Sequence, residues 1–409
     1  MVKWIIVILL FLLSLRLFLF YQLRDEYREG EEVVFDALLL TEPIAQGRLQ
    51  RFWVRMPNGQ RIFITASVHP LYHYGQQLAI TGTIQKSQRG ASFLSFPSVI
   101  SSSNQKFSES VFSFLGGIRT HIMTFFQGIL PPTSAGLLLG IVFGIREQIP
   151  SEFTSALRSS GVLHVVAASG MNVSIVVSML AAVSIKFIKR QYAVLVIIPA
   201  VLFYAFLAGL DPPIVRACVM AVLAITASLF GRQYFGLLAL ALTACVMLFI
   251  WPYLLFDIGF QLSFLATLGI LIVKPLLPFH SVQKAVLLPM EDIRTTVAAQ
   301  ITTVPILLFS FGQYGMLSLL ANAFTLWMVP ILMVLGLVAA VASFIVSPLA
   351  QGLVLLALPL LLLFETVVFF VGGLHADVSF SVPPAMVLGY YLLLGAVALL
   401  LYKRKTLSA

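Results

Sequence analysis

Gly161-Val-Leu-His-Val-Val-Ala-Ala-Ser-Gly-Met-Asn172 is the stretch that decides how this chain is interpreted. It opens an apolar segment that runs to about residue 185, yet it contains His164, Ser169, Gly170 and Asn172 among residues that favour lipid. Polar side chains inside a membrane are costly and need an explanation. Two explanations are open: small and polar residues that hold helices together, or groups that line a path across the bilayer.

The composition of the whole chain indicates a membrane protein. Of its 409 residues, 60% are hydrophobic and 10% are charged, and the mean hydropathy is +1.01. A soluble protein of this length cannot bury so much apolar surface, so we predict a polytopic α-helical membrane protein. The net charge of +9 does not by itself indicate nucleic acid, because cytoplasmic loops are rich in Lys and Arg. We interpret Cys218 and Cys245, which lie in apolar segments, as reduced packing residues.

The first quarter of the chain predicts an anchor and an all-β domain. Residues 1–23 are apolar and no small-x-small cleavage site follows them, so we expect an uncleaved membrane anchor. Lys3 precedes this segment and an acidic flank follows it, which predicts a cytoplasmic amino terminus. Between 31 and 106, five alternating runs and the turn dipeptide Asn58-Gly59 predict a small extracytoplasmic barrel of the OB type. The runs are 32–40, 48–56, 60–67, 77–86 and 92–100.

The predicted barrel is basic, and aromatic residues are interleaved with its arginines. Residues 43–106 contain Lys and Arg but neither Asp nor Glu. Cations suit the phosphates of a single-stranded nucleic acid, and aromatic rings suit its bases. The alternative is that the aromatic side chains form the barrel core and the arginines a solvated face. The candidate nucleic-acid-binding residues are Arg48, Arg51, Trp53, Arg55, Arg61 and Phe63.

The remaining chain predicts an interfacial helix at 107–132, a transmembrane domain at 133–402 and a basic cytoplasmic tail at 403–409. The apolar run 133–145 is too short to cross about 30 Å of hydrocarbon, so we expect a re-entrant segment. With it, the chain has about nine to eleven membrane segments. Basic loops alternate with loops that lack Lys and Arg, which predicts the barrel outside and both termini in the cytoplasm. Pro330 is expected to kink or split the long segment 317–346.

Further polar groups interrupt the apolar segments near two predicted helix starts. Asp211 is expected to cap the helix that follows it, and Arg216 lies about one turn further along. Asp257, Gln261 and Ser263 lie at the outer end of another helix, and we expect Asp257 to pair with Arg216. At each of these sites a structural hydrogen bond or ion pair is the alternative to a role in transport.

The residues His164-Val-Val-Ala-Ala-Ser-Gly-Met-Asn-Val173 resemble the signature of the ComEC-type competence channel family. Leu139-Gly-Ile-Val-Phe-Gly144, Pro213-x-x-Arg-Ala217 and Asp257-x-Gly-Phe-Gln-Leu-Ser-Phe264 are similar to that family's pattern in order and spacing. The sequence departs from it at Asn172, which replaces the second histidine of the signature. It also ends without the His-x-His-x-Asp-His motif of the nuclease domain that many relatives carry.

The resemblance implies a channel that imports single-stranded transforming DNA across the bacterial cytoplasmic membrane in natural competence. Its expected partners are single-stranded DNA, the lipid bilayer, a separate extracytoplasmic DNA receptor, a separate nuclease and a cytoplasmic ATP-driven motor, and a homo-oligomer stays open. The residues expected along the DNA path are His164, Ser169, Gly170, Asn172, Asp211, Arg216, Asp257, Gln261 and Ser263.

Nothing in the sequence suggests chemistry on a substrate. It contains neither a Gly-x-x-x-x-Gly-Lys-Ser/Thr motif nor Cys/His spacing of the zinc type. We therefore expect no enzyme activity, no catalytic residues, no metal and no cofactor. Two other functions stay open. One is a secondary transporter of a small solute or lipid, which should contain paired broken helices; the other is a non-conducting scaffold whose barrel binds a partner.

Overall fold

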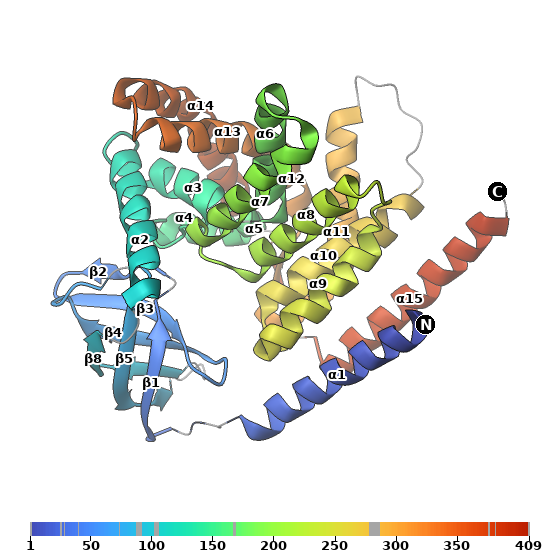
Figure 1. Cartoon of the computed structure of the whole chain (residues 1–409), viewed down its shortest axis with the longest axis horizontal. Helices are drawn as coiled ribbons and strands as arrows, with labels where there is room; N and C mark the ends of the chain where they lie inside the picture. Colours follow the sequence, from blue (N-terminus) through green and yellow to red (C-terminus); the bar gives the residue numbers. More distant parts are fainter. Residues whose placement is uncertain are drawn as a thin grey trace.

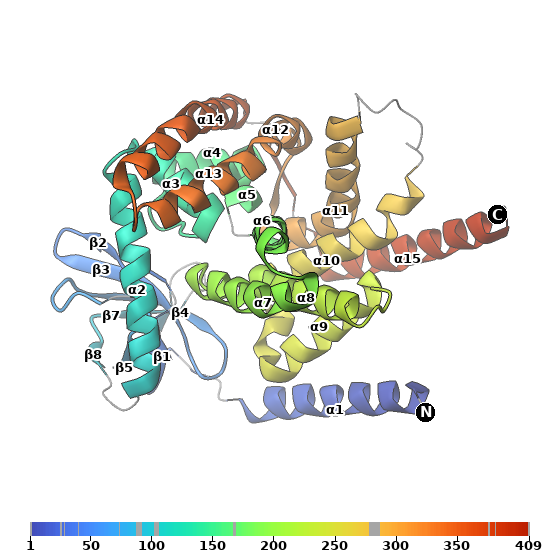
Figure 2. The same cartoon turned by 45° about the horizontal axis from the view of Figure 1, so that its top comes forward.

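A small β domain lies beside a larger body of helices in the computed structural model of the chain (Figure 1). The structure describes residues 2–24, 27, 29–39, 41–72, 74–86, 92–101, 106–166, 169–277, 287–374, 377–380 and 382–407. Helix α1 (Val2–Leu23) precedes the β domain, and α2 (Lys106–Gln127) connects it to the helical domain. The two ends of the chain lie on the side of the molecule away from the β domain (Figures 1 and 2).

The β domain is a closed barrel. Its strands pair in the orders β1-β5-β8 and β2-β3-β4-β7-β6. Because β1 and β2, β5 and β6, and β7 and β8 are consecutive, each pair acts as one bent strand, and five such strands close into a ring. This is the OB-type barrel that the alternating runs predict. The strands are β1 (Glu32–Leu38), β2 (Ile44–Gln46), β3 (Leu49–Arg55), β4 (Arg61–Ser67), β5 (Gln77–Thr83), β6 (Gln85–Lys86), β7 (Ser92–Ser95) and β8 (Ser98–Ser101).

Alternation along β3 and β4 decides which aromatic side chains are inside the barrel. Phe52 is buried in the barrel core, whereas Trp53, the next residue, is 46% exposed. Phe63 lies directly opposite Trp53 in the antiparallel pair, so it is on the same outer face. The hairpin turns at Asn58-Gly59, where Gly59 has φ +87°, a conformation that favours glycine. The aromatic residues of the basic stretch are therefore divided between the core and the outer surface.

The helical domain contains the following elements. They are α3 (Pro132–Phe143), α4 (Ser151–Ser159), α5 (Leu163–Val166), α6 (Gly170–Phe187), α7 (Arg190–Leu207), α8 (Pro212–Leu229), α9 (Gly236–Ile250), η1 (Pro252–Phe256), α10 (Ile258–Ile272), η2 (Lys274–Leu276), α11 (Leu287–Phe311), β9 (Gln313–Gly315), α12 (Ser318–Thr325), α13 (Met328–Ala342), α14 (Ser347–Gly373), β10 (Asp377–Ser379) and α15 (Pro384–Leu407). Helix α3 lies in the core, and Ser134–Phe143 are all buried. Protein rather than lipid therefore surrounds this short apolar helix.

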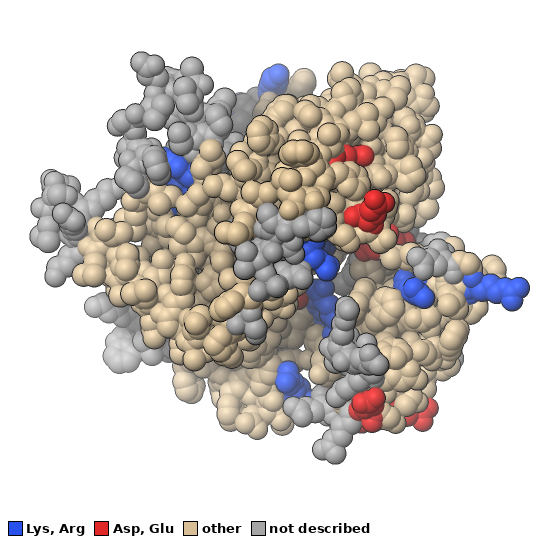
Figure 3. All heavy atoms as spheres, turned by 180° about the vertical axis from the view of Figure 1, so that it is seen from behind, with Lys and Arg blue, Asp and Glu red and all other residues tan. Residues whose placement is uncertain are grey.

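The helices confirm a polytopic membrane protein. Within the described residues, five helices are long and apolar enough to span a membrane, and a sixth span results if α12 and α13 count as one. Other apolar helices, α3, α6, α7 and α9 among them, are shorter. Most of the surface in Figure 3 carries neither acidic nor basic side chains, as expected for a lipid-covered protein.

Two predicted membrane segments are broken. The segment from 161 to 185 divides into α5 and α6, and the intervening Ala167 and Ala168 lie outside the described residues. The segment from 317 to 346 divides into α12 and α13 with a bend of 48°. This second break falls after Thr325 and not at Pro330, which lies in the first turn of α13, where a missing N–H is tolerated.

The turn between α13 and α14 lies against the helix that leaves the barrel. It contacts α2, because the His121 and Phe344 rings are 4.2 Å apart and Ser343 Oγ lies 3.3 Å from His121 Nε2. Strict alternation of the loops predicts that this turn lies on the inner side of the membrane. The turn contains neither Lys nor Arg. The distribution of Lys and Arg therefore does not predict on which side of the membrane this turn lies.

Candidate functional site

The break before α6 is held by hydrogen bonds within its own signature. Ser169 is the N-cap residue of α6, and its hydroxyl donates to Asn172 Oδ1 at 3.1 Å. The Asn172 amide in turn donates to the Ile141 carbonyl of α3 at 2.7 Å, and its side chain is fully buried. Asn172 therefore ties α6 to α3. His164 has an exposed side chain, and its Nδ1 lies 3.1 Å from the Gly161 carbonyl oxygen.

The Arg216 side chain lies across the start of α6. It is 8% exposed, and its Nε donates to Ser263 Oγ at 2.7 Å. A Cβ atom built on Gly170 would lie 2.5 Å from Arg216 Nη2, so only glycine allows this approach without displacing the guanidinium. The structure thus brings Gly170, Arg216 and Ser263 together. The expected pairing of Arg216 with Asp257 is wrong, because Asp257 has other partners.

Asp257 connects the helical domain to the barrel. Its Oδ1 accepts from the Phe260 N–H at 3.0 Å and so caps α10, whereas Oδ2 pairs with Arg61 Nη2 at 3.1 Å. The cap predicted for Asp211 does not form. Asp211 stands at the N-cap position of α8 but makes no cap hydrogen bond, and it pairs instead with Arg146 at 2.7 Å. Gln261 donates to the Leu255 carbonyl at 2.9 Å, which closes the turn before α10.

The β3–β4 hairpin contacts the short helix η1, and we call this contact the hairpin-tip contact. Arg55 Nη1 donates to the Tyr253 hydroxyl at 2.7 Å, and the guanidinium lies 4.5 Å from the centre of the Tyr253 ring. Gly59 packs directly on Tyr253, because an added Cβ would approach the Tyr253 Cβ to 2.2 Å. Together with the Arg61–Asp257 pair, this holds the tip of the hairpin on the loop before α10. Arg55 and Arg61, two of the six candidate nucleic-acid-binding residues, are therefore engaged with the helical domain.

The other four candidates, two aromatic residues and two arginines, lie on the outer surface of β3 and β4 and in the turn before β3. Trp53 and Phe63 have ring centres 5.0 Å apart on neighbouring strands. Arg51 is exposed on β3 beside Trp53, with its side chain on the same face of the strand. Arg48 is exposed in the turn before β3. We call Arg48, Arg51, Trp53 and Phe63 the outer barrel face.

A second contact between the barrel and the helices, which we call the Arg119 junction, was not predicted from the sequence. Arg119 of α2 is 3% exposed, and its guanidinium lies 4.2 Å from the centre of the Tyr74 ring of the barrel. Its Nη1 donates to the Leu207 carbonyl at 2.8 Å, and Tyr74 donates to the Phe206 carbonyl at 2.7 Å. These carbonyls lie in the last turn of α7, where no further helical turn follows to donate to them. The Phe206 carbonyl also accepts from the Gly209 N–H at 3.3 Å. Burial raises the pKa of Tyr74, so its hydroxyl remains a donor.

Two acidic residues, Glu42 and Glu365, were not predicted from the sequence as site residues. Glu42 Oε1 lies 3.9 Å from Arg119 Nε. Glu365, in the middle of the apolar helix α14, accepts a hydrogen bond from Ser134 of α3. A single acid inside an apolar run was the sequence signal for Glu365. For Arg119 the signal was a basic residue on the otherwise apolar face of its helix, the face that is buried.

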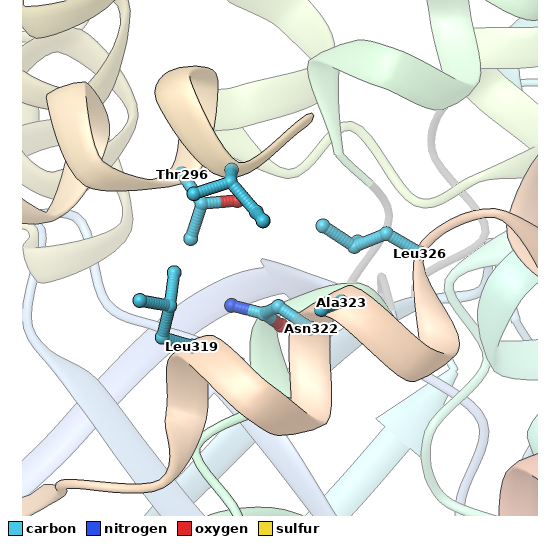
Figure 4. Close-up of a pocket in the computed structure, with 6 residues that line it drawn as sticks. Thr296, Leu319, Asn322, Ala323 and Leu326 are labelled. Carbon is cyan, nitrogen blue, oxygen red and sulfur yellow. The ribbon is translucent and has the colours of Figure 1, made fainter. Parts of the chain in front are cut away.

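A small cavity lies between α11 and α12. Its volume of about 10 Å³ is enough for one water molecule, and it is lined by residues that include Thr296 and Asn322. The Asn322 side chain is 2% exposed and turned toward Thr296 (Figure 4). The cavity is too small for a nucleotide or another organic ligand, so it is not a substrate site. Both cysteines are free, with Cys218 buried.

Comparison with known proteins shows the family to which the helical domain is similar. A family model described as "Competence protein" matches residues 141–404. "ComE operon protein 3" of Bacillus subtilis (strain 168) is 30% identical over 206 residues, which is 50% of this chain and 26% of that protein. An uncharacterized protein of Aquifex aeolicus (strain VF5) is 30% identical over 197 residues, 44% of this chain and 47% of its own length. The chain thus covers less than half of either relative. No solved structure matches.

Proposed function

The chain belongs to the competence protein family, and from that premise we propose that it is a channel for single-stranded DNA. In this proposal it imports transforming DNA across the bacterial cytoplasmic membrane during natural competence. The barrel lies outside, and both termini lie in the cytoplasm. The strand is gathered by the outer barrel face and enters the helical domain beside the hairpin tip.

The observation that carries the proposal is the position of the outer barrel face. Trp53 and Phe63 offer two adjacent rings to bases, and Arg48 offers a cation to phosphate. The same hairpin is attached to η1 and Asp257. That loop contains no Lys or Arg, as expected for a loop on the outer side. A strand bound to the barrel would therefore be held next to the outer end of the helical domain.

The break before α6 is the part of the path that we propose inside the membrane. Arg216 is a single buried cation beside the small residues Ser169, Gly170 and Ser263. A lining without cations would oppose a polyanion, and a strongly basic lining would retain it. His164 contributes a polar side chain nearby. The remaining candidates act indirectly, because their hydrogen bonds and ion pairs hold the helices around the path; they are Asn172, Asp211, Asp257 and Gln261.

One observation favours the transporter alternative, so it remains the second candidate. Secondary transporters use pairs of broken helices, and this chain contains two broken segments, α5–α6 and α12–α13. The segments touch each other, because a Cβ on Gly161 would lie 2.4 Å from Ser318 Cβ. A transporter of a small solute or lipid would use these breaks for alternating access. Directional DNA import would in turn depend on a separate receptor, nuclease and ATP-driven motor.

Labelled DNA uptake tests the proposed function. A strain without this gene should bind DNA at its surface but accumulate none in the cytoplasm, and the wild-type gene should restore import. Arg216→Ala should restore little import, whereas Arg158→Ala, at an exposed position of α4, should restore all of it. Normal import in the deletion strain would exclude the channel. Purified chain in vesicles separates the candidates further, since a transporter moves small solutes and leaves single-stranded DNA outside.

Binding of oligothymidylate to the full chain tests the outer barrel face. Trp53→Ala should weaken binding by a factor of about 5 to 150, because one base loses a stacking partner worth about 1–3 kcal/mol. Its effect should be the same at low and high salt. Arg48→Gln should instead lower the slope of log affinity against log salt concentration by about 0.7, the share of one phosphate contact on a single strand. Equal effects of both substitutions on the salt slope would contradict these assignments.

A further inference from the structure

We propose that the barrel binds three consecutive nucleotides of single-stranded DNA on two neighbouring rows of side chains, and that Phe93 is a third position on which a base stacks. The inference rests on the proposed function, because single-stranded DNA is the ligand, and it adds a residue and a site size. We call Trp53, Phe63 and Phe93 the aromatic row, and Arg51, Thr65 and Ser95 the polar row.

The register of the β-strands aligns the three rings of the aromatic row. Trp53 of β3 lies directly opposite Phe63 of β4, and Phe63 lies directly opposite Phe93 of the parallel strand β7. Residues paired in this way have their side chains on the same face of a sheet. Leu94, the next residue along β7, is fully buried in the barrel core, whereas Phe93 is partly exposed. The aromatic surface therefore extends over three neighbouring β-strands.

The polar row follows the same register. Arg51 lies opposite Thr65, and Thr65 lies opposite Ser95. Each of them is two residues along its β-strand from a member of the aromatic row, a separation of about 7 Å. Arg51 and Ser95 are exposed. A guanidinium and two hydroxyl groups thus run beside the rings, across the same three β-strands.

The two rows match the two parts of a nucleotide. Bases stack on aromatic rings with little regard to sequence, and phosphate oxygens accept hydrogen bonds from guanidinium and hydroxyl groups. Because the rows are parallel, single-stranded DNA that crosses the three β-strands has its bases over one row and its backbone over the other. Residues 43–106 contain neither Asp nor Glu. A polar row so close to the rings also favours a nucleotide over an apolar protein surface as the occupant.

Photo-cross-linking tests which side chains touch the bases. Oligothymidylate is irradiated together with the full chain in lipid nanodiscs, and mass spectrometry identifies the cross-linked residues. We expect adducts on all three residues of the aromatic row. Adducts on Trp53 and Phe63 without any on Phe93 would overturn the third position and leave the proposed function intact. Absence of adducts on all three would overturn the row together with the proposed role of the barrel in gathering DNA.

The affinity for oligothymidylate tests whether the Phe93 ring contributes to binding. Phe93→Leu keeps an apolar side chain but removes the ring, and it should weaken binding by a factor of about 5 to 150, the effect of one lost base stack. Phe93→Tyr keeps the ring and should bind as the wild type does. Phe114→Leu, the same substitution at an exposed position of α2, is the matched control and should leave the affinity unchanged. Unchanged affinity in Phe93→Leu, or an equal loss in Phe93→Tyr or Phe114→Leu, would overturn stacking on Phe93.

Oligonucleotide length tests the site size. Phe93→Leu should weaken binding of trithymidylate but should hardly change binding of dithymidylate, because Trp53 and Phe63 hold both bases of the shorter ligand. An equal loss for both lengths would contradict three separate base positions.

Discussion

The barrel contacts the helical domain in two places, and each contact depends on arginine in a different way. In the Arg119 junction the guanidinium is 3% exposed and has an aromatic ring and a backbone carbonyl as partners. In the hairpin-tip contact the Arg61 side chain is 50% exposed and pairs with the Asp257 carboxylate. The Arg119 guanidinium is therefore a buried group, with the Glu42 carboxylate also 3.9 Å from its Nε, whereas the Arg61–Asp257 ion pair is reached by solvent on its arginine side.

This difference predicts different functions for the two contacts. Removal of a buried hydrogen-bonded cation leaves its partners unsatisfied and is costly, whereas an exposed ion pair contributes little and is screened by salt. A DNA phosphate can compete with Asp257 for Arg61 in solvent, but it cannot reach Arg119. We therefore expect the Arg119 junction to fix the barrel on the helices and the hairpin-tip contact to exchange partners.

Replacement of Arg119 should have the largest effect. Arg119→Ala removes the partner of the Leu207 carbonyl and of Glu42, and we expect the free energy of unfolding to fall by about 3 kcal/mol. Thermal unfolding of the purified chain in detergent measures the loss. Arg158→Ala, a change of the same type at an exposed position, should shift the unfolding temperature little. Equal shifts for the two variants would mean that the Arg119 junction does not stabilise the protein.

Replacement of Gly59 should have an intermediate effect that is specific to the hairpin tip. Gly59→Ala places an alanine at φ +87° and directs its methyl group into Tyr253. The backbone conformation alone costs about 1–2 kcal/mol, and displacement from η1 adds to this. Gly30→Ala is the control, because Gly30 has φ +83° and open space around it. Hydrogen exchange near Tyr253 should accelerate in Gly59→Ala only; acceleration in both would indicate general unfolding.

Replacement of Asp257 should have the smallest effects and should separate its two roles. Asp257→Asn keeps a cap for α10 but loses the ion pair with Arg61, so stability should fall by less than about 1 kcal/mol, and only at low salt. Asp257→Ala also loses the cap and should cost about 1 kcal/mol at any salt concentration. Unfolding at low and high salt measures both. A salt-independent loss in Asp257→Asn would show that the ion pair is not an exchangeable contact.

Local patterns predicted the parts of the fold whose causes lie close together in sequence. The barrel follows from alternation and from Asn58-Gly59, and the membrane helices follow from apolar length. The break at Ser169-Gly170 was foreseen because small and polar residues interrupt a helix. The exact end of α12 was not foreseen, because Pro330 is the helix breaker that the sequence shows, whereas neither proline nor glycine marks the bend after Thr325.

Partners across long sequence distances could not be predicted. Asp257 was expected to pair with Arg216 because both lie near outer helix ends. Its partner is instead Arg61, which precedes Asp257 by 196 residues. Depth in the membrane places two groups at one level without showing which of them face each other. The bond of Asn172 to the Ile141 carbonyl could not be predicted either, because the two residues are 31 positions apart in the sequence.

The hydrogen bonds that Tyr74 and Arg119 donate to the last carbonyls of α7 have a consequence for biogenesis. The carbonyls that end this helix are bonded by side chains that precede them by 132 and 88 residues, Tyr74 and Arg119. At about 5–20 residues per second, translation gives the barrel several seconds to fold before the end of α7 leaves the ribosome. The earlier domain thus serves as a template on which a later helix is completed, so a barrel that folds slowly would delay assembly of the membrane domain.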